Sequence, residues 1–232
     1  MYDAATVRRS YREQLRAFRP WRPVRVSYAI KACGIAAVAG VLAATGADAS
    51  AASLGEVLAA RRARFAARRI QLHGNAKTEE ELRAALRLGV GRIVVDGADE
   101  IHRLARLVAR RRSAQAVWLR VSPGISADTH PHLRTGALDS KFGAPVAGGE
   151  ALAQAAALAR TRGLRLVGLH AHIGTQLHEA DRYGELGRVM VELARRVRAE
   201  TGAPIREIGV GGGLGIPLRG DERVLDLDAY AR

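Results

Sequence analysis

The stretch RIQLHGNAKTEEELRAALRLGVGRIVVDG, from Arg69 to Gly97, contains one complete strand–helix–strand unit. Its two ends, RIQLHG and RIVVDG, are short apolar runs that stop at glycine, as strands often do. The segment between them, TEEELRAALRLG, has apolar residues three and four positions apart, which is typical of an amphipathic helix. Because two strands separated by a helix cannot form a hairpin, this stretch predicts parallel strands joined by a right-handed crossover.

The same unit repeats through the rest of the chain. Strand-like runs alternate with Ala/Leu/Arg segments of helical periodicity, and the first five runs start at nearly regular intervals. The runs are Val24–Ile30, Gly46–Ala51, Arg69–Gly74, Arg92–Gly97, Ala116–Ser122, Leu164–Gly174 and Ile205–Gly213. A chain of 232 residues, 48% of them hydrophobic, is long enough for one domain with a sizeable core. We therefore predict a single α/β domain over residues 1–232.

The ends of the predicted strands distinguish between two parallel architectures. A doubly wound sheet binds its ligand at one switch point, whereas a (β/α)8 barrel gathers functional residues from the carboxyl ends of many strands. Polar residues or a glycine run follow most of the predicted strands: Lys31, His73, Asn75, Asp96, Arg120, His170, His172 and Gly211–Gly213. This distribution favours a TIM (β/α)8-type barrel. Seven strands are found, and the residues after Gly213 predict a loop and the start of a helix, so we expect the barrel to be incomplete.

The charge and composition limit the classes of partner. The formal net charge is +14, but the arginines are spread through amphipathic segments and aromatic residues are only 4% of the chain. Few side chains are therefore available to stack on bases. We expect the positive charge to lie on solvated helix faces, and we expect no nucleic-acid partner.

The only cysteine, Cys33, excludes an intrachain disulfide and fits the reducing conditions of the cytoplasm. It opens CGIAAVAGVLAAT, an apolar run that is similar to the core of a signal peptide. The run is too short to span a bilayer, and it lies behind a proline-containing segment and a predicted strand. We therefore expect a cytoplasmic protein that is neither exported nor inserted in a membrane.

Lysine is rare in this chain. Lys31, Lys77 and Lys141 are the three lysines among 37 basic residues. An arginine keeps its charge at physiological pH, whereas a lysine in an apolar pocket can lose its proton and form an imine with a carbonyl group. Two interpretations of Lys31 follow from the residues alone: a reactive amine at a strand end, or an exposed strand-end lysine.

The run GVGGGLG, from Gly209 to Gly215, follows the last predicted strand. Glycines allow several backbone N–H groups to approach one anion, so the run is a candidate phosphate cradle. It lacks the GKS or GKT ending of a nucleotide P-loop. An imine-forming lysine and a phosphate cradle on the same barrel rim together imply pyridoxal 5′-phosphate.

Two histidines, His170 and His172, lie two positions apart and point the same way from a strand. Such a pair occurs in metal sites, but no third ligand is arranged nearby in the sequence. A flat ring that stacks on a flat cofactor needs no third ligand. We therefore predict no metal site.

Six segments in order match a known family: YAIKA, LHGNAKTEEEL, GVGRIVVDGADE, LRVSPGISADTHPHLRTGALDSKFG, GLHAHIGTQL and IGVGGGLGI. From about Tyr2 to Ile216 the chain resembles the barrel domain of the fold type III, alanine-racemase-like, pyridoxal-phosphate decarboxylases. The HGN and HIGTQ segments favour the diaminopimelate branch over the ornithine and arginine branches. The resemblance implies decarboxylation of meso-2,6-diaminopimelate to L-lysine, with an amino acid as the small-molecule substrate.

The resemblance also implies roles for individual residues. Lys31 is similar to the lysine that forms the Schiff base with the cofactor, and His172 to the histidine that stacks on its pyridine ring. Thr175, where the family usually has serine, would donate its hydroxyl to the phosphate. The glycines that match the phosphate-binding turn are Gly211, Gly212 and Gly213.

Four further residues match the family as supporting positions. Arg120 corresponds to an arginine of the barrel interior, and Lys141 lies in the KFG segment of the rim. His73 and Asn75 lie on the HGN rim, where two interpretations are open: contact with the ligand, or local hydrogen bonds at the end of a strand.

The family places further groups beyond the segments matched here. They are a glutamate on the eighth strand, in an EPGR-type segment, and a C-terminal β-domain that contributes cysteine and tyrosine across a homodimer interface. Neither is found in this sequence, so we expect a truncated form with weak activity or none, and marginal stability because strand edges would be unpaired. Two alternatives are a non-catalytic pyridoxal-phosphate carrier and a decarboxylase-like partner subunit.

Overall fold

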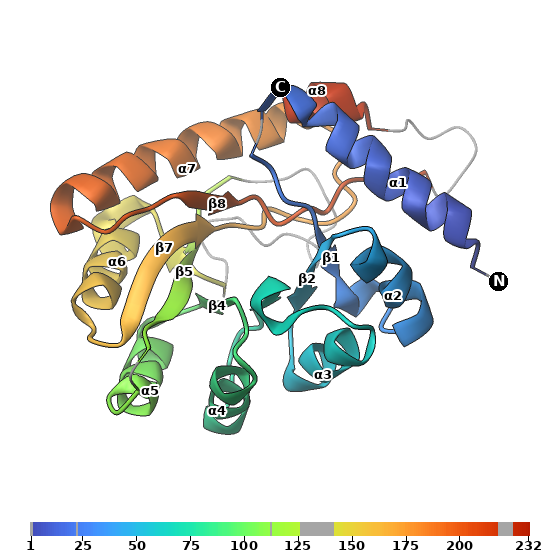
Figure 1. Ribbon diagram of the computed structural model, residues 1–232. Coiled ribbons are helices and arrows are strands. Elements are labelled where there is room, and N and C mark those ends of the chain that lie inside the picture. The colour runs from blue at the N-terminus through green and yellow to red at the C-terminus, as the bar shows by residue number, and fades with distance from the viewer. Residues whose placement is uncertain (1, 22, 112, 126–141, 218–224) are drawn as a thin grey trace. The chain divides into compact units, whose positions relative to one another are not determined.

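A computed structural model describes residues 2–21, 23–111, 113–125, 142–217 and 225–232. The chain divides into two compact units, Met1–Val94 with Ala231 and Val95–Tyr230 with Arg232. Each unit alternates strands and helices, as the sequence predicts (Figure 1).

The first unit is built on short parallel strands in the order β1-β2-β3-β4. Its strands are β1 (Ser27–Ala29), β2 (Asp48–Ala51), β3 (Ile70–Leu72) and β4 (Arg92–Val95), the last of which reaches the boundary. Its helices are α1 (Ala4–Ala17), α2 (Ala36–Ala44), α3 (Leu54–Arg62) and α4 (Glu79–Leu88). Helix α3 packs against β2 and β3 and lies between α2 and α4 (Figure 1).

The core of the first unit consists of small and branched side chains. Ala49 and Ala51 of β2 have no exposed surface, and Val57 of α3 and Leu72 of β3 are equally buried. Alternate residues of β2 are buried, so only one of its faces is covered completely. Small residues on β2 allow the helix to approach the sheet closely.

The second unit contains longer strands. They are β5 (Gln115–Ser122), β7 (Leu164–His170) and β8 (Glu207–Gly209), paired in parallel in that order, with the two-residue strand β6 (Ala144–Pro145) on β5. The helices are α5 (Ala98–Val108), α6 (Glu150–Arg160), α7 (Ala180–Thr201) and α8 (Leu227–Ala231). Helix α6 packs against both β7 and α7 (Figure 1).

The α/β fold with parallel strands is confirmed, and the differences lie at strand ends. The predicted strand Ile205–Gly213 forms β8 over three residues only, because three successive glycines after it adopt left-handed backbone angles. The predicted strand Leu164–Gly174 ends at His170, so His172 lies in the following loop. Strand β6 was not predicted, since two residues carry no periodicity. No helix among the described residues is long and apolar enough to cross a membrane.

Candidate functional site

The loop after β8 is a turn of three glycines, Gly211, Gly212 and Gly213, with φ of 73°, 65° and 91°. Residues with a Cβ atom rarely adopt these angles. A Cβ on Gly213 would lie 2.0 Å from the carbonyl oxygen of Gly174, and one on Gly211 would lie 2.5 Å from that of Ala171. Glycine is therefore required for both conformation and space, and the turn lies directly against the segment that follows β7.

The glycine turn has the features of an anion-binding site. The N–H groups of Gly212, Gly213 and Leu214 donate to no acceptor within the part of the chain that the structure describes. Successive N–H groups in a turn of this kind form a concave site that binds phosphate. The turn therefore fits the phosphate of a pyridoxal cofactor.

His172 lies beside the glycine turn. Its Cε1 atom would be 3.0 Å from a Cβ on Gly213, and its own Cβ atom 2.7 Å from one on Gly211. The side chain is half-buried, and Thr175 follows three residues later as an exposed residue of the same loop. The second unit thus brings together His172 and the glycine turn, and Thr175 lies three residues after His172 in the chain.

Lys31 belongs to the first unit, in the 3-10 turn Ile30–Ala32 directly after β1. The buried Ile30 anchors this turn, and the N–H of Cys33 donates to the carbonyl oxygen of Ile30 at 3.1 Å. The hydroxyl of Tyr28 donates to the carbonyl oxygen of Cys33 at 2.9 Å, and burial raises the pKa of Tyr28 to about 12. The Lys31 side chain is exposed and accessible to a ligand.

His73 and Asn75 follow β3, at the same carboxyl edge of the first unit as Lys31. The N–H of His73 donates to the carbonyl oxygen of Ala51 at 2.8 Å, and Asn75 is exposed. Between them, Gly74 lies so close to the residue after β2 that a Cβ would be 1.9 Å from the carbonyl oxygen of Ala52. This edge is therefore tightly packed.

Sequence reasoning gave no role to Lys77, which the structure places at this edge. The residue is 1% exposed, and its ammonium group donates to the carbonyl oxygens of Gly74 and, at 2.8 Å, Val94. One signal was present in the sequence, since Lys77 is one of only three lysines in an arginine-rich chain. Lys77 ties the loop after β3 to β4.

Arg120 is a buried residue of β5, in the second unit. Its guanidinium lies 3.5 Å from a carboxylate oxygen of Asp96 and 4.6 Å above the ring of Phe142. Burial lowers the pKa of Arg120, and the neighbouring Asp96 carboxylate opposes this shift. The ion pair holds Asp96, in the loop after β4, against strand β5.

His170 and His172 lie in different surroundings. It is buried at the end of β7 and stacks on Trp118, with ring centroids 6.4 Å apart. The indole N–H of Trp118 donates to Glu207 at 2.7 Å. In the described part of the chain, no cluster of three His, Cys, Asp or Glu side chains is suited to a metal ion. Lys141 lies outside the described residues.

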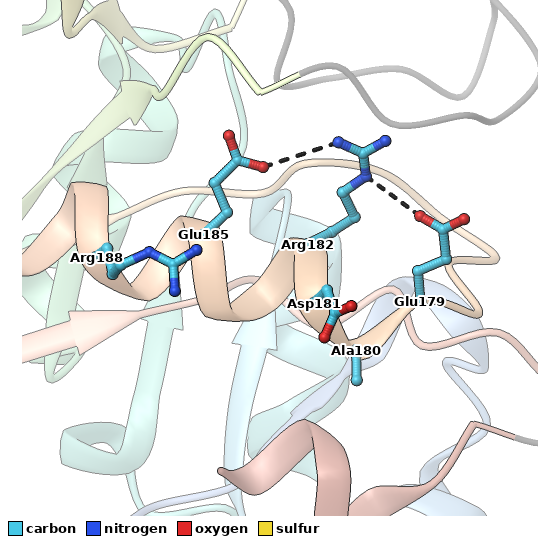
Figure 2. A pocket seen from close by; sticks show the side chains of 6 residues that line it. All are labelled: Glu179, Ala180, Asp181, Arg182, Glu185 and Arg188. Carbon is cyan, nitrogen blue, oxygen red and sulfur yellow. Dashed lines mark hydrogen bonds and ion pairs between the residues drawn. The ribbon is translucent and has the colours of Figure 1, made fainter.

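A shallow hollow of ≈ 640 Å³ lies at the start of α7 (Figure 2). It is lined by Glu179, Ala180, Asp181, Arg182, Glu185 and Arg188. Arg182 forms ion pairs with Glu179 at 3.2 Å and Glu185 at 3.8 Å, and the two acidic side chains are 63% and 46% exposed. None of the residues predicted to bind the cofactor lines this hollow.

Comparison with known proteins identifies the family. Residues 4–232 match the family model described as pyridoxal-dependent decarboxylase, pyridoxal binding domain. The chain belongs to this family. The resemblance seen in the six sequence segments is thereby confirmed.

Curated relatives within the pyridoxal-dependent decarboxylase family include diaminopimelate decarboxylases. That of Actinosynnema pretiosum subsp. auranticum is 40% identical over 230 residues, which cover 99% of this chain and 50% of the relative. That of Staphylococcus aureus is 33% identical over 224 residues, covering 96% of this chain and 52% of the relative. The chain thus spans about half the length of these relatives.

Solved structures give the same result. Diaminopimelate decarboxylase from Helicobacter pylori, complexed with L-lysine, matches with a TM-score of 0.91 and 27% identity, over 99% of this chain and 57% of that one. The enzyme from M. jannaschii, also in complex with L-lysine, matches with a TM-score of 0.90 and 27% identity, over 99% of this chain and 54% of that one. The chain has the fold of the pyridoxal-binding barrel domain.

Proposed function

We propose that this chain is the cofactor-binding part of a diaminopimelate decarboxylase, which converts meso-2,6-diaminopimelate to L-lysine with pyridoxal 5′-phosphate. The observation that carries the proposal is the glycine turn beside His172, in a chain whose curated relatives are diaminopimelate decarboxylases. The L-lysine bound in two structural neighbours is the product of the proposed reaction.

Each group of the chain has a distinct part in binding. The N–H groups of the glycine turn would bind the phosphate, and the hydroxyl of Thr175 would donate to it. The ring of His172, fixed beside the turn, would lie against the flat face of the cofactor. Lys31 would hold the cofactor covalently through its Nζ atom. When bound, the cofactor supplies an electron sink for the pair released as carbon dioxide leaves the substrate.

The proposal also includes the class of substrate, the oligomeric state and the location of the protein. The substrate would be a small amino acid, and the homodimer is what the sequence resemblance implies. We place the protein in the cytoplasm, where its single cysteine fits the reducing conditions.

The attachment site is tested by labelling. The protein is mixed with pyridoxal 5′-phosphate, the imine is reduced with borohydride, and peptides are examined by mass spectrometry. Because the chain has only three lysines, the modified residue is identified without ambiguity. We expect the label on Lys31, which is exposed, and none on Lys77, whose Nζ donates to two carbonyl groups. A label on another lysine, or none on any, contradicts the assignment.

The reaction is tested by release of carbon dioxide from meso-diaminopimelate, with L-ornithine and L-arginine as competing substrates. Release from meso-diaminopimelate alone supports the proposed branch of the family. Labelling of Lys31 without release from any of the three is the result expected of a cofactor-binding part alone, and equally of a carrier or a partner subunit.

A further inference from the structure

We propose that Gln176 and Tyr183 are positioning residues for the glycine turn, which hold its N–H groups in the direction of the cofactor phosphate. The inference rests on the proposed function, since phosphate is the anion expected at the turn. All groups involved belong to the second unit.

Tyr183 fixes one peptide plane of the turn. Its hydroxyl, on α7, donates to the carbonyl oxygen of Gly212 at 3.0 Å. Because a peptide bond is planar and trans, the carbonyl of Gly212 and the N–H of Gly213 point in opposite directions. The hydrogen bond holds the carbonyl of Gly212 toward Tyr183, so the N–H of Gly213 points away from Tyr183.

The Tyr183 side chain is itself held firmly. It is 5% exposed, and its ring meets that of Tyr230 edge to face, with centroids 4.7 Å apart. Burial raises the pKa of Tyr183 well above its ordinary value, so the hydroxyl keeps its proton and remains a donor. A buried donor of this kind selects one orientation of the peptide that it binds.

Gln176 fixes the chain that follows the turn. Its side-chain oxygen accepts from the N–H of Ile216 at 3.0 Å, and its side-chain nitrogen donates to the carbonyl oxygen of Ile216 at 3.2 Å. Its neighbour Leu177 donates to the carbonyl oxygen of Gly213 at 3.0 Å and accepts from the N–H of Gly215 at 2.7 Å. The loop after β7 thus holds the turn through both backbone and side chain.

The backbone angle of Gln176 indicates that surrounding contacts hold this residue in an unfavourable conformation. Its φ is 60°, a left-handed value that is unfavourable for a residue with a long side chain. Such strain persists where surrounding contacts offset it, and it often occurs at ligand sites. The paired hydrogen bonds to Ile216 are contacts of this kind.

The experiment compares two probes that differ only in the phosphate, pyridoxal 5′-phosphate and pyridoxal. Tyr183→Phe keeps the ring and removes the hydroxyl, and Gln176→Ala removes both hydrogen bonds to Ile216. For Tyr183→Phe we expect about three- to tenfold weaker binding of pyridoxal 5′-phosphate, the effect of one lost hydrogen bond. Gln176→Ala loses two and should weaken this binding at least as much, and binding of pyridoxal should be unchanged in both variants. Tyr11→Phe, the same change at a buried tyrosine of α1, is the matched control and should alter neither.

Unchanged affinity for pyridoxal 5′-phosphate in both variants, or an equal loss with pyridoxal, would overturn the inference. A second measurement is independent of imine formation. Inorganic phosphate should shift the amide NMR signals of Gly212, Gly213 and Leu214 in the wild-type protein, and should shift them less in the variants. Equal shifts in all proteins, or none in the wild type, contradict the positioning role. If inorganic phosphate gives the expected NMR shifts but no imine forms with pyridoxal 5′-phosphate, only the proposed function is contradicted.

Discussion

Lys77 is the most buried charged side chain in the described part of the chain. Its compact ammonium group fits between two carbonyl oxygens, those of Gly74 and Val94. Guanidinium is larger and planar, with donors fixed in a fork. The pocket therefore explains why lysine is retained at this position in a chain that otherwise uses arginine.

Substitutions at Lys77 should destabilise the protein by two different mechanisms. Lys77→Arg overpacks the pocket and should lower the free energy of unfolding by about 1–3 kcal/mol. Lys77→Met leaves two buried carbonyl groups without their donor and should cost about 1–3 kcal/mol. Urea unfolding measures both, with the exposed Arg83→Lys as a control that should change stability by less than about 0.5 kcal/mol. A Lys77→Arg protein as stable as the wild type would contradict this account.

At the residue scale, sequence could predict the groups that carry recognisable chemistry. Lys31, His172 and the glycine turn stand out because their residue types are suited to one cofactor and occur in order along the chain. Gln176 and Tyr183 could not be found in this way. Their partners, Ile216 and Gly212, lie 40 and 29 residues away, so only the fold brings them into contact.

Helix α4 shows how local sequence determines an element. Thr78 and Glu81 form a capping box, in which the Thr78 side chain accepts from the N–H of Glu81 and the Glu81 carboxylate accepts from the N–H of Thr78. Glu81 also accepts from the N–H of Leu54, at the start of α3. The helix ends at Gly89, whose φ is 70°. Both ends could be predicted from the TEEELRAALRLG segment.

The same capping box predicts a dependence of stability on pH. Burial tends to raise the pKa of Glu81, but hydrogen bonds from the N–H groups of Thr78 and Leu54 outweigh it, and the pKa is lowered on folding. A lowered pKa contributes stability that is present above the unfolded value, about 4.3, and is lost as the pH falls through the folded value. Glu81→Gln should therefore be less stable at pH 7, by about 0.5–1.5 kcal/mol, and lose less stability on acidification.

Denaturant unfolding at several pH values checks this prediction. Glu80→Gln, at the exposed neighbouring position of the same turn, is the control and should follow the wild type. Parallel pH profiles for the wild type and Glu81→Gln would show that Glu81 does not contribute.

The residues at which strands end are the least predictable feature of the secondary structure. The pattern of apolar residues predicts where the strands lie, because a buried strand needs apolar side chains regardless of the loop that follows it. It did not locate where they end, which is decided by contacts: the strand predicted over Leu164–Gly174 ends at His170 and leaves His172 in a loop, whereas Lys31 follows its strand as predicted. The site depends on these ends more than on the strands themselves.

At the scale of the whole molecule, the cofactor should stabilise the fold by mass action. At a concentration 100 times Kd, a ligand that binds only the folded state adds about 2.7 kcal/mol. For a chain of this size the expected rise in Tm is about 5–10 °C. Differential scanning fluorimetry with pyridoxal 5′-phosphate measures it, and Lys31→Arg should show a much smaller rise. No rise in the wild-type protein would mean that the folded chain does not bind the cofactor.

The hydrogen bond from Trp118 to Glu207 gives the second unit an optical reporter of its own. Trp118 is part-buried between strands, whereas Trp21, the other tryptophan, is 56% exposed in the first unit. A shielded indole and a solvated indole emit at different wavelengths, so each unit can be followed by its own fluorescence. Unfolding of the two units in one step or in two can therefore be resolved without adding any label.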